Sequence, residues 1–550
     1  MPDRAELDAL FPAGLPEPPH WEQRYPPRQL PPGALVTRLG PSPTGHLHIG
    51  QLYTTMIDRD VAHHSGGRYL LRIEDTDQAR EVAGALEQFD RSFAYFGLDA
   101  DEEDGRGDYE PYQQSAREEI YLSYARELLR AGKAYPCFAT PDELAGIRER
   151  QQAAKLPPGY YGDWALWRDA GGDRVRAALA EDTPYVVRFR SPGVPGRRVE
   201  FDEVIRGHLS AEDNYNDVVI LKSARNGVRL PTYHFAHAVD DHLMRVSLVV
   251  RGDEWISSVP LHLQLFGALG FPPVRYAHIA PLMKQAGGSR RKLSKRSDPE
   301  ASVGFYIEQG YPAEAVQYYL RGLANGRLAE MPLREALATP IRLSDFGAAG
   351  PLVDLVKLDD ISADFIATLP AADILGRVTT WAQAYDPPLA GALTVSPELA
   401  LGALAIEREG VQNPRKDLRR WADFRAVYGY FFPQLFAPVT DAADERFGGL
   451  EPLVVRSVAE AFASRYAPPA PDTEWFGQIR ELAADLGFAP NQKAYKKDPD
   501  AYPGSIREAS QIIRVLLTGT PRSPDLAAVA GVLGPDEVLR RTRAVLGPRD

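Results

Sequence analysis

Strand-like and helix-like segments alternate over residues 34–115, and this alternation constrains the fold more than any other feature of the sequence. The run ALVTRL at 34–39 is short and mostly apolar, and a helical pattern follows it from about 50 to 65. The strand-like run YLLRIED at 69–75 and a second helical pattern at 78–96 come next. Strands separated by helices form parallel sheets with crossover helices. We therefore expect an open parallel α/β sheet here.

The order of strand-like and helix-like segments changes along the rest of the chain and divides it into regions. Residues 116–234 break the alternation with an amphipathic helix and strand-like pieces in antiparallel order, as an insertion would. The alternation returns at 235–287, which gives the α/β domain two halves, 34–115 and 235–287. After about residue 300 almost every segment has helical spacing, and proline-containing breakers separate the segments. We expect an all-α C-terminal half.

Composition limits the class of protein. A chain of 550 residues with 44% hydrophobic and 25% charged residues is expected to be globular and to contain several domains. A single cysteine, Cys137, excludes a disulfide framework and a cysteine-cluster zinc site, and it fits a reducing cytoplasm. We find no run of about 18 apolar residues and therefore expect no membrane partner. Residues 1–33 are rich in proline and lack the apolar core of a signal peptide, so we expect an irregular extension, with a docking arm as the less favoured alternative.

The run GPSPTGHLHIGQ, residues 40–51, stands between the first strand and the first helix. A helix that begins near Gly50 points free N–H groups at whatever lies over the turn, and Gly45 and Gly50 would let a ligand approach the backbone. His46 and His48 can donate to phosphate oxygens, although the P-loop pattern with its lysine is missing. This predicts a nucleotide site of another kind. A structural turn with surface histidines explains the spacing equally well.

The run GSRRKLSKRSD, residues 288–298, holds Arg290, Arg291, Lys292, Lys295 and Arg296. Five cations within seven residues on a flexible loop suit a phosphate whose charge grows during transfer. A solvated basic loop is the alternative and would be favoured if the run stood alone.

Read together, the runs PSPTGHLHIG, GGRYLLRIEDTDQAR, PTYHFAHAVDDHLMRVSLVVRGDEW and KLSKR resemble the class I aminoacyl-tRNA synthetases, and in particular the bacterial-type glutamyl enzymes. The resemblance runs from about residue 34 to the C-terminus. It implies a Rossmann-like catalytic domain, an acceptor-end-binding insertion at 116–234, a KLSKR loop with a stem-contact helical domain at 288–373, and an anticodon-binding region at 374–550. Gln51 departs from the first signature, where the general pattern has histidine, and this weakens any role for residue 51 as a donor.

The resemblance also implies a reaction. The enzyme would activate L-glutamate with ATP and transfer it to tRNA(Glu), and Mg²⁺ would accompany ATP. His48, Lys292 and Lys295 would be the catalytic residues. The ATP site would comprise His46, His48, Gly50, Lys292, Ser294, Lys295 and Arg296.

The glutamate site can also be approached from chemistry. A planar arginine binds a carboxylate best, and Arg38 and Arg251 both follow predicted central strands, where ligands of open α/β sheets bind. Solvent-facing arginines at strand ends are the alternative. The resemblance places the glutamate site on Arg38, Ser42, Glu74, Tyr233, His237 and Arg251. Asp240 and Asp241 could contact the ribose or support another residue, or they could be a structural pair at a helix end.

Two basic runs with interleaved aromatic residues, 413–425 and 491–502, are candidates for contact with tRNA. Cations hold phosphates and aromatic faces stack on unpaired bases. An ordinary amphipathic helix and a polar loop would explain them equally well. The candidate residues are Arg415, Lys416, Arg419, Arg420, Lys493, Lys496 and Lys497.

The expected partners are tRNA(Glu), L-glutamate and ATP, and we expect a cytoplasmic monomer with no structural zinc. Three rival interpretations remain. Glutaminyl enzymes end in β-barrels, whereas this chain is expected to end in helices. Truncated relatives that modify a tRNA base lack an anticodon-binding half. A catalytically inactive or specialised tRNA-binding paralogue is the third, and the intact candidate residues argue against it.

Overall fold

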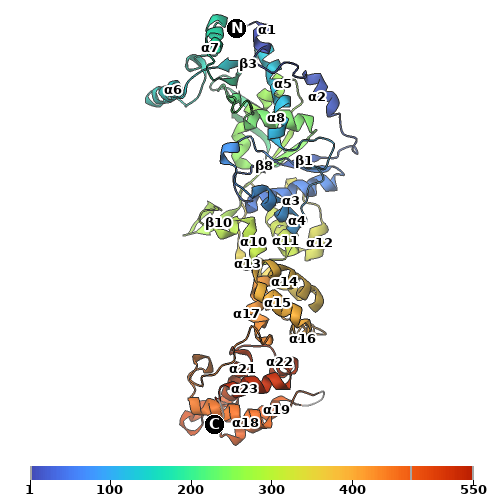
Figure 1. Cartoon of the computed structure of the whole chain (residues 1–550), viewed down its shortest axis with the longest axis vertical. Coiled ribbons are helices and arrows are strands. Elements are labelled where there is room, and N and C mark those ends of the chain that lie inside the picture. The colour runs from blue at the N-terminus through green and yellow to red at the C-terminus, as the bar shows by residue number, and fades with distance from the viewer. Residues whose placement is uncertain (1–2, 471–473, 548–550) are drawn as a thin grey trace. The chain divides into compact units, whose positions relative to one another are not determined.

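The computed structural model describes residues 3–470 and 474–547 (Figure 1). The chain forms two compact units. Unit 1 comprises Met1–Ile307 and Gln317–Asp354, and unit 2 comprises Glu308–Val316 and Leu355–Asp550. Because unit 1 holds the α/β halves, the insertion and part of the region that follows, the finer domain boundaries stay predictions.

Unit 1 is built around two pairs of parallel strands. The paired strands are β1 (Val36–Leu39) with β2 (Arg68–Leu71), and β8 (Leu248–Gly252) with β9 (Arg275–Ile279). The two pairs meet where the backbone N–H of Ser247 donates to the carbonyl of Val36 at 2.9 Å. The predicted parallel α/β architecture is confirmed.

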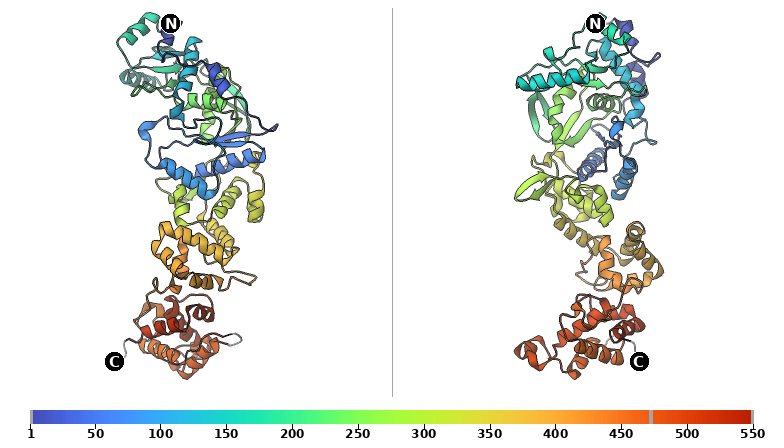
Figure 2. Two further views of the ribbon diagram at one scale, coloured as in Figure 1. Left: turned by 45° about the vertical axis from the view of Figure 1, so that its right-hand side comes forward. Right: turned by 60° about the vertical axis from the view of Figure 1, so that its left-hand side comes forward.

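Helix α3 (Ile49–His64) is the crossover from β1 to β2, and it lies against both strands (Figure 2). Its buried residues include Leu52, Met56 and Ile57, which recur at the spacing of one helical face. The hydroxyl of Thr37 on β1 donates to the backbone carbonyl of Asp58 at 2.8 Å. The position of α3 therefore fixes the turn at 40–48 over the ends of the strands.

The insertion has antiparallel sheets, as predicted. Strands β3 (Ala134–Cys137), β4 (Val186–Phe189) and β7 (Val219–Leu221) form one sheet, and β5 (Arg198–Glu203) and β6 (Gly207–Glu212) form a hairpin. The helices are α5 (Glu118–Arg130), α6 (Pro141–Ala153) and α7 (Gly172–Ala180). Helix α5 buries its apolar face against α8 (Tyr233–Leu243) and α9 (Val259–Leu269), so the first helix of the insertion is part of the catalytic-domain core.

Residues 3–33 correct the expectation of an irregular extension. They contain α1 (Arg4–Asp8) and α2 (Pro18–Arg24). Five of their apolar side chains are buried in the core of unit 1, namely Leu7, Phe11, Leu15, Trp21 and Tyr25. Asp8 pairs with Arg130 of α5 at 2.6 Å, and Glu22 pairs with Arg245, just after α8, at 2.9 Å. The prolines obscured the spacing of the apolar residues in the sequence.

The basic segment at 288–298 is more ordered than a flexible loop. Strands β10 (Met283–Ala286) and β11 (Ser289–Lys292) form an antiparallel hairpin. Gly287 and Gly288 make its turn with φ values of 53° and 85°, which a residue with a side chain rarely adopts. Only residues 293–298 remain irregular.

Helices dominate the rest of the chain. In the rest of unit 1 and where the two units divide, they are α4 (Ala85–Phe96), α10 (Val303–Gln309), α11 (Ala313–Ala324) and α12 (Leu333–Ala338). After residue 354 they are α13 (Leu355–Ala367), α14 (Ala371–Tyr385), α15 (Pro387–Val395), α16 (Pro397–Ala405), α17 (Phe424–Tyr428), α18 (Pro452–Arg465), α19 (Phe476–Asp485), α20 (Gln492–Lys497), α21 (Ile506–Thr518), α22 (Leu526–Leu533) and α23 (Pro535–Ala544). Among its described residues, unit 2 has no β-strand beyond one isolated bridge between Ala489 and Ser505. The predicted all-α C-terminal half is confirmed.

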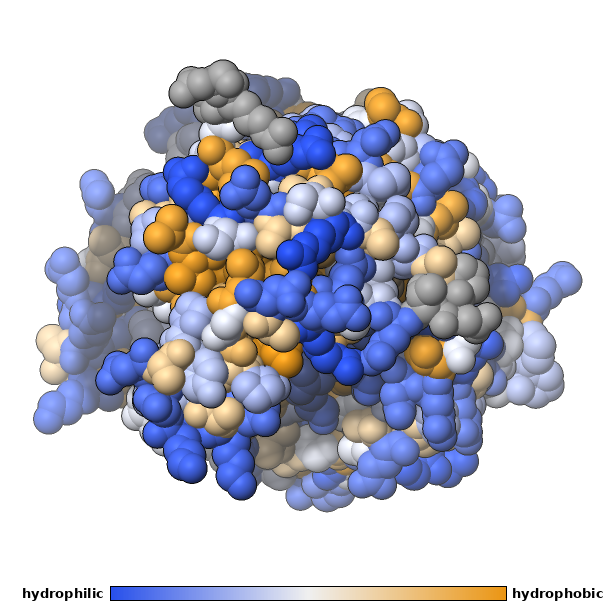
Figure 3. Space-filling model, turned by 90° about the horizontal axis from the view of Figure 1, so that it is seen from below, coloured by the Kyte–Doolittle hydropathy of each residue, from blue (hydrophilic) through white to orange (hydrophobic). Residues whose placement is uncertain are grey.

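The surface viewed in Figure 3 carries hydrophobic residues in small groups among hydrophilic ones. Within the described part of the chain, no single helix is long and apolar enough to cross a membrane. Helices α15 and α16 pass that test only as a pair, and they are bent by 92° relative to each other.

Candidate active site

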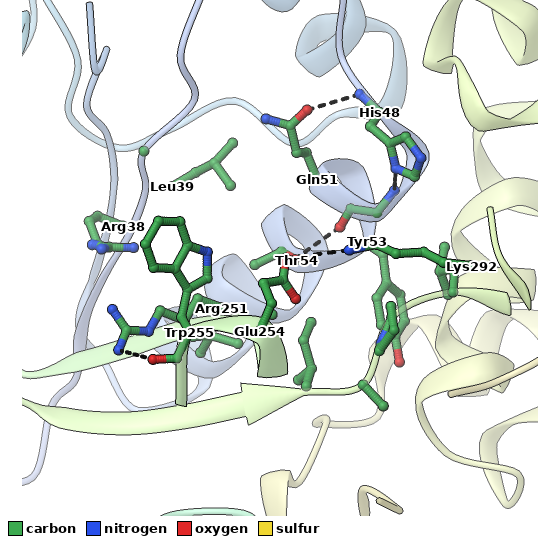
Figure 4. A pocket seen from close by; sticks show the side chains of 18 of the residues that line it. Arg38, Leu39, His48, Gln51, Tyr53, Thr54, Arg251, Glu254, Trp255 and Lys292 are labelled. Atoms are coloured by element: carbon green, nitrogen blue, oxygen red, sulfur yellow. Dashed lines mark hydrogen bonds and ion pairs between the residues drawn. The ribbon is translucent and has the colours of Figure 1, made fainter. Parts of the chain in front are cut away.

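A cavity of about 390 Å³ opens at the carboxyl ends of β1 and β8. Ligands of open α/β sheets bind at this edge. Seven residues predicted for the ATP and glutamate sites line it, namely Arg38, His48, Gly50, Glu74, Tyr233, Arg251 and Lys292. Figure 4 shows Arg38 and Arg251 on the side of the cavity where Trp255 lies, and His48 and Lys292 on the other side. The cavity therefore has two arginines at one end, and a lysine and the N-terminus of α3 at the other.

His48 caps the N-terminus of α3. Its Nδ1 accepts from the backbone N–H of Gly50 at 2.9 Å, and the backbone N–H of His48 donates to Oε1 of Gln51 at 3.0 Å. Gln51, which departs from the general signature, therefore closes a capping box. Burial, reinforced by the charge of Lys295, lowers the pKa of His48 to about 4, so its imidazole is neutral at physiological pH.

The two signature segments touch each other. A β-bridge joins His48 to Ser302, and the backbone N–H of Val303 donates to the carbonyl of Leu47 at 3.0 Å. The ammonium group of Lys295 donates to the backbone carbonyl of His46. His46, Ser294, Lys295 and Arg296 do not line the cavity, so only part of the predicted ATP set is assembled there.

Asp298 anchors the basic segment, and the sequence reasoning missed it. Its buried carboxylate accepts from Arg291 at 2.6 and 2.7 Å, from the backbone N–H of Ser294 at 3.0 Å, and lies 3.2 Å from Lys284. The hydrogen bonds from Arg291 hold the pKa of Asp298 well below its usual range. Asp298 follows a run of five cations, and its isolated position could have indicated that it pairs with one of them.

Arg38 belongs to a buried ionic network. Its Nε lies 3.4 Å from Asp241, which also accepts from Arg72 at 2.5 Å. Arg72 in turn donates to Glu74 at 3.0 Å. Burial would raise the pKa of Asp241, but Arg72 and Arg38 hold it well below its usual value. Arg72 was also missed by the sequence reasoning, although an arginine inside an apolar strand was a signal.

The structure places Asp240 and Asp241 near the end of α8 and away from the cavity, and whether they support another residue or only the helix end stays a prediction. Both are completely buried, and neither lines the cavity. Asp240 accepts from Arg117 at 2.8 Å and from the hydroxyl of Tyr121 at 2.7 Å. His237 lies behind the cavity wall, where its Nδ1 is 2.8 Å from Asp241. Ser42 also lies outside the lining, so these predicted contacts with glutamate are not assembled in the cavity.

The carboxylate of Glu74 lies close to the backbone of Gly40. A Cβ atom at Gly40 would lie 2.3 Å from Oε1 of Glu74, so only glycine leaves room for the carboxylate as it stands. Burial raises the pKa of Glu74 even though Arg72 and Arg38 oppose that shift. A cationic group entering the cavity would stabilise the charged form of Glu74.

The cations predicted to contact tRNA fall into two groups. Those at 415–420 are paired within unit 2, as in the ion pairs of Arg415 with Glu407 at 2.9 Å and of Lys416 with Asp364 at 2.6 Å. Arg419 and Arg420 also face carboxylates. The three lysines on α20 are exposed, and the described residues show no ion pair for them. These are Lys493, Lys496 and Lys497.

A second cationic place in unit 2 was not predicted. Arg507, Arg514 and Arg522 line a cavity of about 520 Å³ beside Phe476. Burial lowers the pKa of Arg514, whose guanidinium donates to the hydroxyl of Ser523 at 2.6 Å. The arginines are spread over 16 positions, on α21 and in the segment after it, so no local run of charge revealed them.

Two family models match the sequence. The catalytic domain of class I tRNA synthetases (E and Q) matches residues 34–341, and an anticodon binding domain matches residues 505–546. The second match includes the three arginines that line the cavity beside Phe476.

Curated relatives and solved structures resemble the whole chain. The glutamate–tRNA ligase of Clostridium beijerinckii is 41% identical over 532 residues, which is 95% of each chain. That of Sorangium cellulosum is 41% identical and covers 97% of this chain and 98% of its own. The crystal structure of a glutamate tRNA ligase from Elizabethkingia meningosepticum in complex with its amino acid superposes with a TM-score of 0.72 at 26% identity, covering 93% of this chain and 99% of that one.

Proposed function

The chain belongs to the class I tRNA synthetases for glutamate and glutamine, and we propose that it acts as a glutamate–tRNA ligase. It activates L-glutamate with ATP and then transfers the glutamyl group to the 3′ terminal ribose of tRNA(Glu), releasing AMP. One observation supports this above all others. Two buried arginines and a partly buried glutamate share one cavity with a helix N-terminus and a lysine.

Recognition of glutamate follows from the charges of the cavity. Arg38 and Arg251 bind the side-chain carboxylate, and Glu74 binds the α-amino group with help from Tyr233. Glutamine would leave the buried cation of Arg251 without a counter-charge, and an unpaired buried charge is costly. A site of this kind therefore prefers glutamate.

Adenylate formation is a displacement at the α-phosphorus of ATP by the α-carboxylate of glutamate, with pyrophosphate as the leaving group. The protein contributes positioning and charge rather than proton transfer. The partially positive N-terminus of α3 and the side chain of His48 hold phosphate oxygens, and Lys292 and Lys295 neutralise the departing pyrophosphate. Neutral His48 acts here as a hydrogen-bond partner and not as a cation.

Magnesium enters with the nucleotide in this proposal. Within the described residues, no group of three or more His, Cys, Asp or Glu side chains could hold a metal ion. Mg²⁺ keeps several waters and is commonly bound through substrate phosphates. Glu254 lies in the cavity and pairs with Lys292 at 3.5 Å, so it is the carboxylate nearest the phosphate end.

Transfer and tRNA binding use the rest of the chain. The terminal ribose hydroxyl of tRNA attacks the activated carbonyl and displaces AMP, with the insertion at 116–234 holding the acceptor end. The lysines of α20 and the arginines lining the cavity beside Phe476 contact the anticodon region. We also propose that the enzyme acts as a monomer, since one chain carries every proposed group, and that it acts in the cytoplasm.

The test is ATP–pyrophosphate exchange by the purified protein with glutamate, with and without tRNA(Glu). We expect exchange that requires glutamate, and charging of tRNA(Glu) with labelled glutamate. Glutamine and tRNA(Gln) are the matched substrate controls. A protein that binds tRNA(Glu) but neither exchanges pyrophosphate nor charges tRNA would be an inactive tRNA-binding paralogue, and the proposed function would be refuted.

A further inference from the structure

Arg251 is buried among neutral acceptors. Its side chain is 6% exposed. Its Nε donates to Nε2 of His278 at 3.1 Å, and its two terminal nitrogens lie 3.4 Å from Nδ1 of His262. The remaining partners are the hydroxyl of Tyr233 at 3.4 Å and the carbonyl of Trp255 at 3.3 Å. Among the described residues, no carboxylate is within ion-pairing distance of Arg251.

The second arginine of the cavity has the opposite surroundings. Arg38 lies 3.4 Å from the carboxylate of Asp241, which also pairs with Arg72. Part of the charge of Arg38 is therefore compensated before any ligand enters. The charge of Arg251 is not, and a buried cation without a counter-ion attracts an anion strongly.

The tautomers of the two histidines follow from their other partners. His278 accepts at Nε2, so its proton is on Nδ1, which lies 3.3 Å from Oε1 of Glu203. His262 faces Arg251 with Nδ1, so its proton is on Nε2, which lies 2.9 Å from Nδ1 of His234. Each ring can accept from the guanidinium only in its neutral form.

Burial keeps these rings neutral. Desolvation holds the pKa of His262 well below its usual value, and the charge of Arg251 adds to that effect. Desolvation also lowers the pKa of His278, although Glu203 opposes the shift. Neither histidine lines the cavity, so both act from behind Arg251.

We propose that His262 and His278 are positioning residues that determine specificity. They satisfy the N–H groups of Arg251 and fix its guanidinium without neutralising it, which leaves its charge for the side-chain carboxylate of the substrate. A carboxylate in either place would hold the guanidinium equally well but would cancel its charge. The inference rests on the proposed glutamate site.

Three variants of His262 distinguish the effect of a hydrogen-bond acceptor for Arg251 from the effect of the charge that the acceptor carries. In His262→Asn, the amide oxygen can occupy the place of Nδ1 and remain a neutral acceptor. His262→Leu removes the acceptor, and His262→Asp supplies an acceptor with negative charge. His278→Gln and His278→Leu repeat the first comparison at an independent position, where the amide takes the place of Nε2.

The readouts are the KM values for glutamate, glutamine and ATP in pyrophosphate exchange, and glutamate affinity by calorimetry. We expect His262→Asn to change the KM for glutamate by less than about threefold and His262→Leu to raise it by about tenfold or more, since a buried hydrogen bond to a charged group is lost. His262→Asp should raise it by about a hundredfold and narrow the preference for glutamate over glutamine. The KM for ATP should stay within about twofold in all variants.

His242→Asn is the matched control, because His242 is a part-buried histidine near the end of α8 that pairs with Glu22 instead of Arg251. His242→Asn should change neither the KM values for glutamate, glutamine and ATP nor the affinity for glutamate. The inference is overturned if the Leu variants leave the KM for glutamate unchanged, if the Asn and Leu variants lose affinity equally while remaining folded, or if His262→Asp keeps its preference for glutamate. Wild-type protein that binds no glutamate would instead refute the proposed function.

Discussion

The two units differ in where they place titratable groups. All 11 histidines of the chain lie in the sequence of unit 1, and unit 2 has none. Unit 1 buries ionic networks such as that of Arg38, Arg72 and Asp241, whereas unit 2 has a large apolar helical core and many of its ion pairs are exposed. Buried charges are costly unless they are paired, so a fold keeps them where chemistry requires them. The contrast places the chemistry in unit 1 and gives unit 2 the character of a binding surface.

The largest expected effect tests the buried network. Arg72→Met leaves Asp241 and Glu74 short of a counter-charge in the interior, and it should destabilise unit 1 by about 3–5 kcal/mol in urea unfolding. Lys416→Met is the matched change in unit 2, where the pair with Asp364 is exposed, and it should cost less than about 1 kcal/mol. Similar losses in the two variants would remove the contrast between the units.

Lys295→Ala separates catalysis from binding. The loss of a cation that stabilises the departing pyrophosphate should slow glutamate-dependent exchange by about 10²–10³-fold. Affinity for tRNA(Glu), measured by filter binding, should be nearly unchanged because the lysines of α20 remain. Arg290→Ala is the control, since Arg290 is an exposed cation on the neighbouring strand β11. Equal losses of exchange and tRNA affinity would contradict the assignment.

Acidic pH should destabilise unit 1 selectively. Burial lowers the pKa of His234 and His237 to about 4, below the value of about 6.5 for an unfolded chain. Between these values the unfolded chain binds more protons, so stability present above pH 6.5 is lost as the pH falls, by about 2 kcal/mol per histidine at pH 5. In unit 2, the hydrogen bonds from Arg446 lower the pKa of Asp444 to about 2, so the corresponding loss there begins only at lower pH.

Thermal unfolding of the whole chain at pH 7 and pH 5 checks this. At pH 5 the unfolding transition of unit 1 should move to a lower temperature, and the transition of unit 2 should stay at the same temperature. His237→Gln should reduce the pH dependence of the first transition, because it removes one of the depressed groups. Parallel shifts of both transitions would show that the histidines do not control the difference.

The smallest effect compares two lysines of unit 2. Lys496 is exposed on α20, and Lys416 is paired with Asp364. Lys496→Ala should weaken tRNA binding and reduce the slope of log affinity against log salt by about 1. Lys416→Ala should leave that slope unchanged. The reverse order would move the tRNA-binding surface to residues 413–425.

Local pattern was sufficient for some features and not for others. The strand at 34–39, a helix from about residue 50 and the placement of Arg251 at a strand end were all predicted, because each depends on neighbouring residues, and β1, α3 and β8 confirm them. Residues defined by distant partners were missed. Arg72 meets Asp241 across 169 positions, and no periodicity signals such a pair.

The tRNA surface shows the same limit. A run of cations predicts charge but not whether that charge is free, and Arg415 is held by two carboxylates of its own unit. The arginines of the cavity beside Phe476 show the opposite case. They are separated in the sequence and come together only in the folded unit, so no run of cations predicts them.

The docking of α1 and α2 has a consequence for synthesis on the ribosome. Trp21 and its apolar neighbours leave the ribosome well before residue 245, and Glu22 finds its partner Arg245 only after α8 has been made. At about 5–20 residues per second this interval lasts roughly 10–40 s. Helix α5 is made earlier and offers part of the native surface, so the segment completes its docking in two steps, first on α5 and then on the residues that follow α8.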